Sequence, residues 1–387
     1  MLTKARRVAT QLLLIYPFSI AKADELGKVN DSSPASEGRA ISCRNQSLDV
    51  LRGAAILLVL GRHFPYYSVW TRAGWIGVDL FFVISGFLIS GLLFSEYKAT
   101  GAISFKRFFV RRGFRIYPPY YSFLLLTLPF TIGRLTWSDL TFMQSYFTGF
   151  WGHGWSLSVE EHFYIILPLS LMLSLFLCPR SEFRWIPYAL PVLMALCLAM
   201  RAAVGPGANT RQVIDPTHLR IDALFAGVTL GWLYHFKRER FRSAARKIYL
   251  LPTGIVLSSS AFLVDQSSFG IYTVGLTANL LGFACVVMWA VEHPVLGRLK
   301  PIAMIGTFSY SIYLWHWPLW QIVEGSLGVT RTGFWAYVFA SIATGMVMGK
   351  AVEVPSLRFR DRVLAKQQRP AKEASVEPNR VAISGVG

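Results

Sequence analysis

The sequence predicts an all-α, polytopic integral membrane protein with about ten transmembrane helices. Only 16% of its 387 residues are charged and 53% are hydrophobic, whereas soluble domains carry about 25% charged residues. Apolar stretches of about 20 residues, the length that crosses a bilayer, recur along the chain. Arginine and lysine gather in the short segments between these stretches, which is also typical of a membrane protein.

The apolar stretches place the transmembrane helices and the domain boundaries. The expected helices cover 47–67, 74–94, 114–132, 155–178, 184–204, 218–236, 247–264, 270–291, 301–323 and 333–353. They form one membrane domain over residues 47–360. Residues 1–46 are expected to be an N-terminal extension and linker. Residues 361–387 are polar and basic, and we expect them to be a disordered cytoplasmic tail.

Two basic segments predict the orientation. Segments 95–115 and 236–247 each carry six lysines and arginines. Because cytoplasmic loops are rich in positive charge, both segments and both chain termini are expected on the cytoplasmic side of a bacterial inner membrane. Topology thereby explains the net charge of +18. The expected partner is a lipid bilayer and not a nucleic acid.

The N-terminus allows a second interpretation. Residues 8–20 are apolar, follow Lys4, Arg6 and Arg7, and precede an Ala-Lys-Ala sequence, as in a secretory signal peptide. Cleavage of this segment would place every loop on the opposite side of the membrane. The distribution of positive charge among the loops predicts the orientation without cleavage. An interfacial or poorly ordered extension is therefore the favoured interpretation.

The four cysteines, Cys43, Cys178, Cys197 and Cys285, show no CxxC or other ligand spacing. Neither a disulfide framework nor a zinc site is expected, and we predict no metal in the function. The cysteines are interpreted as packing residues.

Ionisable side chains within apolar stretches are costly to bury, which makes each a candidate for function. Arg52 and His63 are eleven residues apart, so a helix returns them to nearly the same face at a spacing of about 16 Å. Arg52, near the cytoplasmic end, could hold an anionic donor, and His63, in the outer half, could act as a general base. The structural alternative is an arginine that extends to the membrane surface and a histidine hydrogen-bonded to a neighbouring helix.

Arg112 and Arg115 lie three residues apart where the third expected helix begins, so they share one helix face. Arginine binds phosphate through paired hydrogen bonds, and a phosphate-bearing donor in the cytosol would arrive on this side. The alternative is that both arginines only contribute to the positive charge that sets the topology.

The fourth expected helix opens with Trp155 and Ser156 on the outer side and carries the adjacent Glu160 and Glu161. Ser158 and Glu161 fit a capping box, which is a structural explanation for one carboxylate. Glu160 has no such explanation. Two adjacent carboxylates could orient an imidazole or bind the hydroxyl groups of an acceptor.

Two further helices contain polar candidates. Arg220 and Asp222 open the sixth expected helix, where they either neutralise each other or take part in binding. The ninth has four polar side chains at helical spacing: Ser309, Tyr310, Tyr313 and His316. Hydrogen bonding between helices is their structural interpretation, and substrate binding by Tyr310 and His316 is the functional one.

Seven segments carry a resemblance to a known family. In chain order they are LDVLRGAAILLVLGRH (48–63), GVDLFFVISGFLIS (77–90), RRGFRIYPPYY (111–121), WSLSVEEHFY (155–164), RIDALFAG (220–227), FSYSIYLWHWP (308–318) and VEVPSLRFR (352–360). Together they resemble the acyltransferase family 3 membrane proteins, O-acyltransferases that modify bacterial surface polysaccharides and related glycans. The segments extend over nearly the whole expected membrane domain.

The resemblance implies roles for the candidates. The family's Arg-x10-His motif falls on Arg52 and His63, with the histidine as catalytic base. Its Arg-x-x-Arg motif falls on Arg112 and Arg115, which would meet acyl-coenzyme A. In the fourth helix, His162 stands where the family more usually has glutamine. Some relatives add an extracytoplasmic hydrolase-like domain that completes transfer. We expect none after the last helix here, so such a partner would be a separate protein.

We therefore predict a membrane O-acyltransferase that moves an acyl group, with acetyl as the first candidate, from cytosolic acyl-CoA to a hydroxyl of an extracytoplasmic glycan or glycolipid. His63 would deprotonate the hydroxyl, and Glu160 or Glu161 would provide orientation. Arg112 and Arg115, with Arg52, would hold the coenzyme phosphates. The candidates for substrate binding are Trp155, Ser156, Arg220, Asp222, Tyr310 and His316.

Other functions fit parts of the pattern. The main alternative is a transporter of a sugar or lipid-linked glycan intermediate, with the buried ionisable residues along its path. A non-catalytic membrane scaffold and a lipid acyltransferase of another fold are further alternatives. The sequence leaves the acceptor and the acyl chain open.

Overall fold

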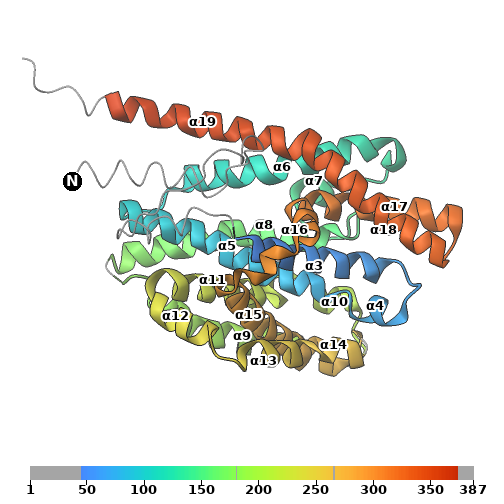
Figure 1. Cartoon of the computed structure of the whole chain (residues 1–387), viewed down its shortest axis with the longest axis horizontal. Coiled ribbons are helices and arrows are strands. Elements are labelled where there is room, and N and C mark those ends of the chain that lie inside the picture. Colours follow the sequence, from blue (N-terminus) through green and yellow to red (C-terminus); the bar gives the residue numbers. More distant parts are fainter. Residues whose placement is uncertain (1–44, 180, 265, 374–387) are drawn as a thin grey trace, which may run out of the picture.

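The computed structural model describes residues 45–373, apart from residues 180 and 265. Every regular element in this part of the chain is a helix, as predicted (Figure 1). The expected N-terminal extension, with its signal-peptide alternative, lies outside the described residues except for its last two positions.

The helices carry the labels of Figure 1. In chain order they are α3 (Gln46–His63), α4 (Ser68–Ala73), α5 (Ile76–Thr100), α6 (Phe105–Thr131), α7 (Trp137–Thr141), α8 (Gly154–Leu177), α9 (Ile186–Val204), α10 (Thr210–Ile214), η1 (Thr217–Leu219), α11 (Ile221–Phe236), α12 (Arg238–Ala245), α13 (Leu250–Ser258), α14 (Ser260–Leu263), η2 (Ile271–Gly275), α15 (Leu276–Glu292), η3 (Pro294–Arg298), α16 (Lys300–Thr307), α17 (Ser309–Leu327), α18 (Arg331–Met348), η4 (Gly349–Glu353) and α19 (Val354–Glu373). Each expected transmembrane segment falls on one helix or on two consecutive helical elements, with breaks at Ser259 and Phe308.

Five helical segments of the described chain are long and apolar enough to cross a membrane. They are α5, α8, α9, η2 continued by α15, and α18 continued through η4 into α19. The other expected segments lie on helices that are shorter, broken or less apolar. The structure is thus that of an all-helical membrane protein, and the number of about ten crossings stays a prediction.

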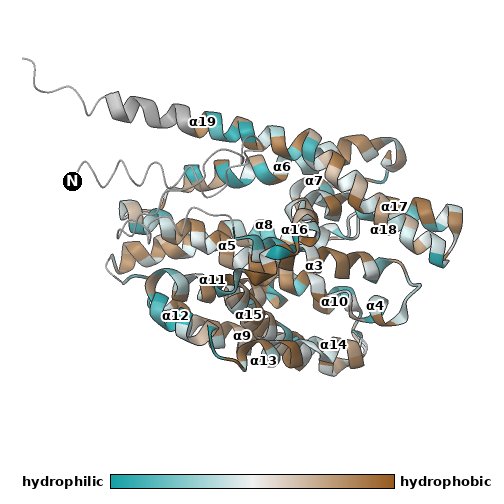
Figure 2. Ribbon diagram, in the orientation of Figure 1, coloured by the Kyte–Doolittle hydropathy of each residue, from teal (hydrophilic) through white to brown (hydrophobic). Residues whose placement is uncertain are grey.

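The exterior is apolar while several charges are buried inside. Phe176 on α8 exposes 83% of its surface and Leu263 at the end of α14 exposes 77%. Hydrophobic residues run along α9 and α13, and hydrophilic residues gather on α12 and α19 (Figure 2). Arg201 and Asp222, in contrast, are fully buried. Lipid favours this distribution, because apolar side chains cost nothing at a lipid boundary and charges must find partners inside.

Glycine allows the central helices to approach closely. An added Cβ at Gly86 on α5 would overlap the carbonyl oxygen of Leu224 on α11. An added Cβ at Gly227 on α11 would overlap the carbonyl oxygen of Val83 on α5. Small residues at such contacts are typical of membrane helix pairs, which gain stability from close packing. The contact fixes the position of α5, which lines both cavities described below.

Three expected boundaries differ in the structure. α5 extends to Thr100 and α6 begins at Phe105, so Arg112 and Arg115 lie about two and nearly three turns inside α6. Much of the basic segment 236–247 forms α12. α19 extends to Glu373, where a disordered tail was expected from residue 361.

The three cysteines within the described residues are free thiols. Cys197 is buried on α9, in agreement with a packing role. Cys178, the residue that ends α8, is exposed, so the packing interpretation is wrong for this position.

Candidate active site

Two cavities lie end to end between α3, α5, α8 and α17, and α6 also lines the first of them. We call the first the arginine cavity, with about 870 Å³ of unfilled space including its open mouth. Its polar lining consists of Arg52, Ser85, Arg112, Arg115, Ser156, Glu160, Glu161, Tyr164, Ser309, Tyr310 and Tyr313. The second, the histidine cavity, has about 910 Å³ of unfilled space, likewise including its open mouth. Its lining includes Arg62, His63, Trp75, His153, Trp155, Arg211, Asp215, Arg220, Gln266, Tyr313 and Trp317.

The order of residues along each helix shows that the cavities form one column. Three helices pass from the arginine cavity to the histidine cavity at these pairs: Arg52 and His63 on α3, Glu160 and Trp155 on α8, and Tyr310 and Trp317 on α17. Val78 on α5 and Tyr313 on α17 line both cavities. Arg52 and His63 thus lie along one face of α3, as predicted, but in different cavities.

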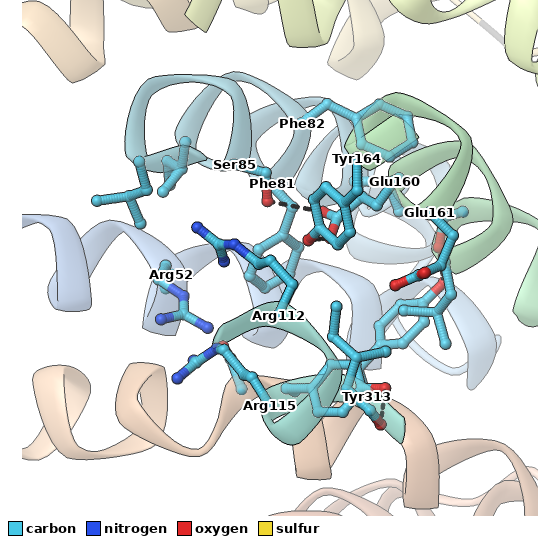
Figure 3. Close-up of a pocket in the computed structure, with 18 residues that line it drawn as sticks. Arg52, Phe81, Phe82, Ser85, Arg112, Arg115, Glu160, Glu161, Tyr164 and Tyr313 are labelled. Carbon is cyan, nitrogen blue, oxygen red and sulfur yellow. Dashed lines mark hydrogen bonds between the residues drawn. The ribbon is translucent and has the colours of Figure 1, made fainter. Parts of the chain in front are cut away.

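Three arginines gather on one side of the arginine cavity (Figure 3). Arg112 is buried, and its Nε and Nη2 have no hydrogen-bond partner among the described residues. Its guanidinium carbon lies 5.4 Å from the centre of the Tyr164 ring. The Nη1 atom of Arg115 lies 3.6 Å from Oε1 of Glu353 on η4. Open guanidinium donors beside a cavity are suited to an anion such as phosphate.

Two carboxylates lie across the cavity from the arginines (Figure 3). Glu160 accepts hydrogen bonds from the hydroxyls of Ser85, at 2.7 Å, and Tyr164, at 2.9 Å. Oε2 of Glu161 accepts a hydrogen bond from Tyr117 at 3.1 Å. Its Oε1 is buried without a partner in the described chain. Glu160 is therefore fixed by its neighbours, while Glu161 keeps one open acceptor.

The position of α8 corrects two expectations. The residue that precedes α8, His153, is only 3% exposed, because α8 begins inside the protein and not at its surface. Ser158 lies a full turn within the helix and donates to Gln144 at 2.5 Å, so a capping box of Ser158 and Glu161 is wrong. Glu160 and Glu161 lie deep enough to share a cavity with the arginines. The sequence placed the start of this helix on the outer side and the arginines on the cytoplasmic side. Neither carboxylate lines the cavity of His63.

Two more histidines lie beside His63. The ring centre of His63 is 5.2 Å from that of His316 and 4.7 Å from that of Trp317. Nδ1 of His316 donates to the carbonyl oxygen of Tyr313 at 2.5 Å, which leaves its buried Nε2 as an open acceptor. His153, which the sequence analysis missed, lies 5.2 Å from His316 between ring centres. No group of three or more histidine, cysteine or acidic side chains in the described chain has the arrangement of a metal site.

Arg220 and Asp222 do not pair with each other, so that expectation is wrong. Arg220 forms an ion pair with Asp79 on α5. Asp222 accepts from Arg201 on α9 at 3.0 Å and lines neither cavity. The sequence analysis missed Asp79 and Arg201, although each is a lone charge within an apolar stretch. That signal could have found both.

The histidine cavity has further polar lining residues at the end of α3, on α10 and beside it, and in the segment before η2. Arg62 donates from Nη2 to Oε1 of Gln266 at 2.9 Å. Burial raises the pKa of Asp215 to about 7, although the positive charges of Arg211 and Arg220 act in the opposite direction. Sequence reasoning missed Gln266, Arg211 and Asp215, because polar residues between the expected transmembrane helices carry no distinguishing pattern.

The remaining candidates lie near the boundary between the cavities. The hydroxyls of Ser156 and Tyr313 are 2.6 Å apart, and Tyr313 also donates to the carbonyl oxygen of His153 at 2.8 Å. Tyr310 donates to the carbonyl oxygen of Ile116 on α6 at 3.1 Å. The column thus joins an arginine-lined end to an imidazole end.

Comparisons with known proteins agree on one family. A family model described as an acyltransferase domain matches residues 45–349. A peptidoglycan O-acetyltransferase of Listeria monocytogenes is 26% identical over 341 residues, which cover 78% of this chain and 53% of that protein. An O-acetyltransferase of Staphylococcus aureus is 29% identical over 336 residues, covering 78% of this chain and 54% of that protein. The chain spans about half the length of these relatives. No solved structure matches it.

Proposed function

The chain belongs to the acyltransferase-domain family and is therefore an acyltransferase, and from this premise we propose that it transfers an acyl group across a membrane. The donor is acyl-CoA on the cytosolic side, with acetyl-CoA as the first candidate. The acceptor is a hydroxyl of a glycan or glycolipid on the other side. The proposed location is the bacterial inner membrane, with about ten crossings and both termini in the cytoplasm.

The arginine cavity is the proposed site for the phosphate groups of coenzyme A. Arg112 offers two buried nitrogens that lack a partner in the described chain, and a phosphate would satisfy both. Arg52 and Arg115 line the same cavity and add positive charge. Across the cavity, the open Oε1 of Glu161 is a suitable acceptor for an amide N–H of the coenzyme's pantetheine arm.

His63 is the proposed general base. It lies eleven residues beyond Arg52 on α3, a spacing of about 16 Å, which the flexible pantetheine arm bridges. The acceptor oxygen forms a bond to the acyl carbon while the carbon–sulfur bond of the thioester breaks. The hydroxyl proton passes to His63 and then to the departing sulfur, which leaves as the free thiol of coenzyme A.

The histidine cavity is the proposed site for the acceptor. Trp155 and Trp317 line it, and indole faces are suited to pack on sugar rings. The relatives named above include a peptidoglycan O-acetyltransferase, so peptidoglycan is the first acceptor to test. We also propose a separate extracytoplasmic protein as a partner that can complete the transfer.

The proposal depends chiefly on one observation, the column of two cavities with open guanidinium donors at one end and His63 at the other. A transporter would also use a polar path through the membrane. It gives no reason for the two buried nitrogens of Arg112 that lack a partner in the described chain, and the comparisons give no support to it.

The test is acetylation by a host strain that lacks this gene and carries the wild type, His63→Ala or His235→Ala. His235, on α11, lines neither cavity and is the matched control. Base-labile acetate is measured on purified peptidoglycan and surface polysaccharide, and membrane protein is measured by immunoblot. We expect His63→Ala to lose at least about 100-fold in acetylation rate, as expected for a general base, and His235→Ala to match the wild type. Unchanged acetylation by His63→Ala at equal protein level would contradict the mechanism.

A further inference from the structure

We propose that Val78 and Tyr313 form a rigid junction between the two cavities and that this junction limits the length of the acyl chain that is transferred. The inference rests on the proposed function, because it assumes a thioester in the arginine cavity and a base in the histidine cavity. It adds what the overall reaction leaves open, the residues that select the acyl group.

The junction is defined by the residues that the two cavities share. On α5, Val78 follows Trp75 of the histidine cavity and precedes Phe82 of the arginine cavity. On α17, Tyr313 lies one turn from Tyr310 of the arginine cavity and one turn from Trp317 of the histidine cavity. Because these are the two side chains that line both cavities, the proposed path from one cavity to the other runs past them.

Both side chains are held in place. The Tyr313 hydroxyl lies 2.6 Å from that of Ser156 and donates to the carbonyl oxygen of His153 at 2.8 Å, so the ring cannot swing aside without losing two hydrogen bonds. Val78 is β-branched and therefore has one strongly preferred rotamer in a helix. The backbone beside it is also fixed, since a Cβ added at the adjacent Gly77 would overlap the carbonyl oxygen of Ala55 on α3. The junction is therefore a fixed opening and not a hinged gate.

The reaction places the acyl group at this opening. The carbonyl carbon must reach an acceptor hydroxyl beside His63 while the coenzyme phosphates stay with Arg112. In the proposed geometry the thioester carbonyl is held at the junction, where the acceptor hydroxyl reaches it from the side of His63, and the chain beyond the carbonyl lies against Val78 and the Tyr313 ring as the carbon–oxygen bond forms and the carbon–sulfur bond breaks. An acetyl group adds a single methyl there. Each further methylene must displace a fixed wall, and one methylene in a shaped pocket changes kcat/KM by about 10- to 200-fold.

The experiment uses the full chain purified into lipid nanodiscs, with acetyl-, propionyl- and butyryl-CoA as donors and chitopentaose as the soluble acceptor probe. Acylated sugar is measured by mass spectrometry and free coenzyme A by its thiol. Val78→Ala enlarges the junction. Val83→Ala removes the same atoms from a buried position on the same helix that lines neither cavity, and Val59→Ala enlarges only the histidine cavity. We expect Val78→Ala to raise the butyryl-to-acetyl ratio of kcat/KM at least about tenfold and both controls to keep the wild-type ratio.

Two further variants test the junction in the opposite direction. Val78→Ile adds one methylene and should lower the propionyl-to-acetyl ratio, which keeps the inference testable if Val78→Ala does not accumulate. Val78→Phe should abolish transfer from all three donors while acetyl-CoA still binds, because the phosphates bind in the arginine cavity.

The possible results separate the two proposals. If the wild type transfers acetyl and the ratios of the Val78 variants equal that of the wild type, the junction does not select the acyl group while the proposed function stands. The same conclusion follows if Val59→Ala raises the butyryl-to-acetyl ratio of kcat/KM as much as Val78→Ala does. If the wild type neither binds acetyl-CoA nor releases coenzyme A, the proposed function fails and the inference fails with it.

Discussion

The buried charges of this protein fall into two groups that meet the cost of burial differently. Arg201 and Arg220 each form an ion pair with a fixed carboxylate, Asp222 and Asp79 respectively. Arg112, which is also buried, makes no ion pair within the described chain and faces a cavity. We infer that the first group serves the fold and the second awaits a ligand.

Charge balance, and not hydrogen-bond completeness, distinguishes the groups. The Nε atoms of Arg201 and Arg220 also lack a partner. Their charges are nevertheless neutralised within the helix bundle, and Nη2 of Arg201 donates in addition to Thr277 at 2.8 Å. Arg112 has no carboxylate within ion-pair distance in the described chain, and a buried charge without such a contact is costly, so we infer that binding of an anion stabilises Arg112.

The largest effect that this comparison predicts is a loss of stability in Asp222→Ala. Arg201 would stay buried without a countercharge, and breaking such a pair costs about 3–5 kcal/mol. The melting temperature in nanodiscs and the amount of protein in the membrane should both fall. The double variant Arg201→Met, Asp222→Leu replaces the pair by apolar side chains and should recover most of this loss. If Asp222→Ala were as stable as the wild type, the pair would not serve the fold.

The second effect is the reverse, a loss of donor binding without a loss of stability, in Arg112→Ala. No fixed carboxylate loses its partner, so the melting temperature should stay within a few degrees of the wild-type value. Hydrogen bonds to charged groups contribute about 1.5–3 kcal/mol each, so the KM for acetyl-CoA should rise about 10- to 100-fold. Arg111→Ala, one residue earlier and outside both cavities, is the control. A large drop in stability with unchanged KM would place Arg112 in the structural group.

The sequence could predict which of these residues share a helix face, because that is a local property. It could not predict contacts between different helices. Arg52 and His63 were assigned to one face of one helix, and helical periodicity is a local property. The pairing of Arg220 with Asp222 was wrong for a local reason as well. Residues two apart on a helix point in nearly opposite directions, so each finds a partner on a different neighbouring helix.

The depth of Glu160 and Glu161 could not be predicted locally. It depends on the segment before α8, which folds inward and buries Gln144 and His153. Hydropathy places helix ends at the membrane surface by default, and it cannot detect a helix that begins inside the protein. The column of two cavities follows from the packing of four helices far apart in the sequence, so it required the structure.

A smaller effect is expected at Arg115, which combines features of both groups. It lines the arginine cavity, and its Nη1 lies 3.6 Å from Glu353. Glu353→Gln removes the competing negative charge, so the KM for acetyl-CoA should fall about two- to fivefold, as for a contact of less than about 1 kcal/mol. Ser311 can still donate to the amide oxygen, as it does to the carboxylate at 2.9 Å, which should keep the stability loss small. An increase in KM would mean that Glu353 positions Arg115 for binding and does not compete for it.

A final effect, the one that depends on pH, concerns Asp215, which meets the cost of burial by holding a proton. Burial raises its pKa from 3.8 to about 7, against the charges of Arg211 and Arg220. Because the folded protein binds this proton more tightly than the unfolded chain does, stability should fall as the pH rises from about 4 to 7, with the full cost above that range. Asp215→Asn cannot ionise. Its melting temperature relative to the wild type should therefore increase with pH over this window and level off above about pH 8. A difference that is constant with pH would mean that Asp215 stays ionised over this range, and Arg211 would then belong with the paired charges of the fold.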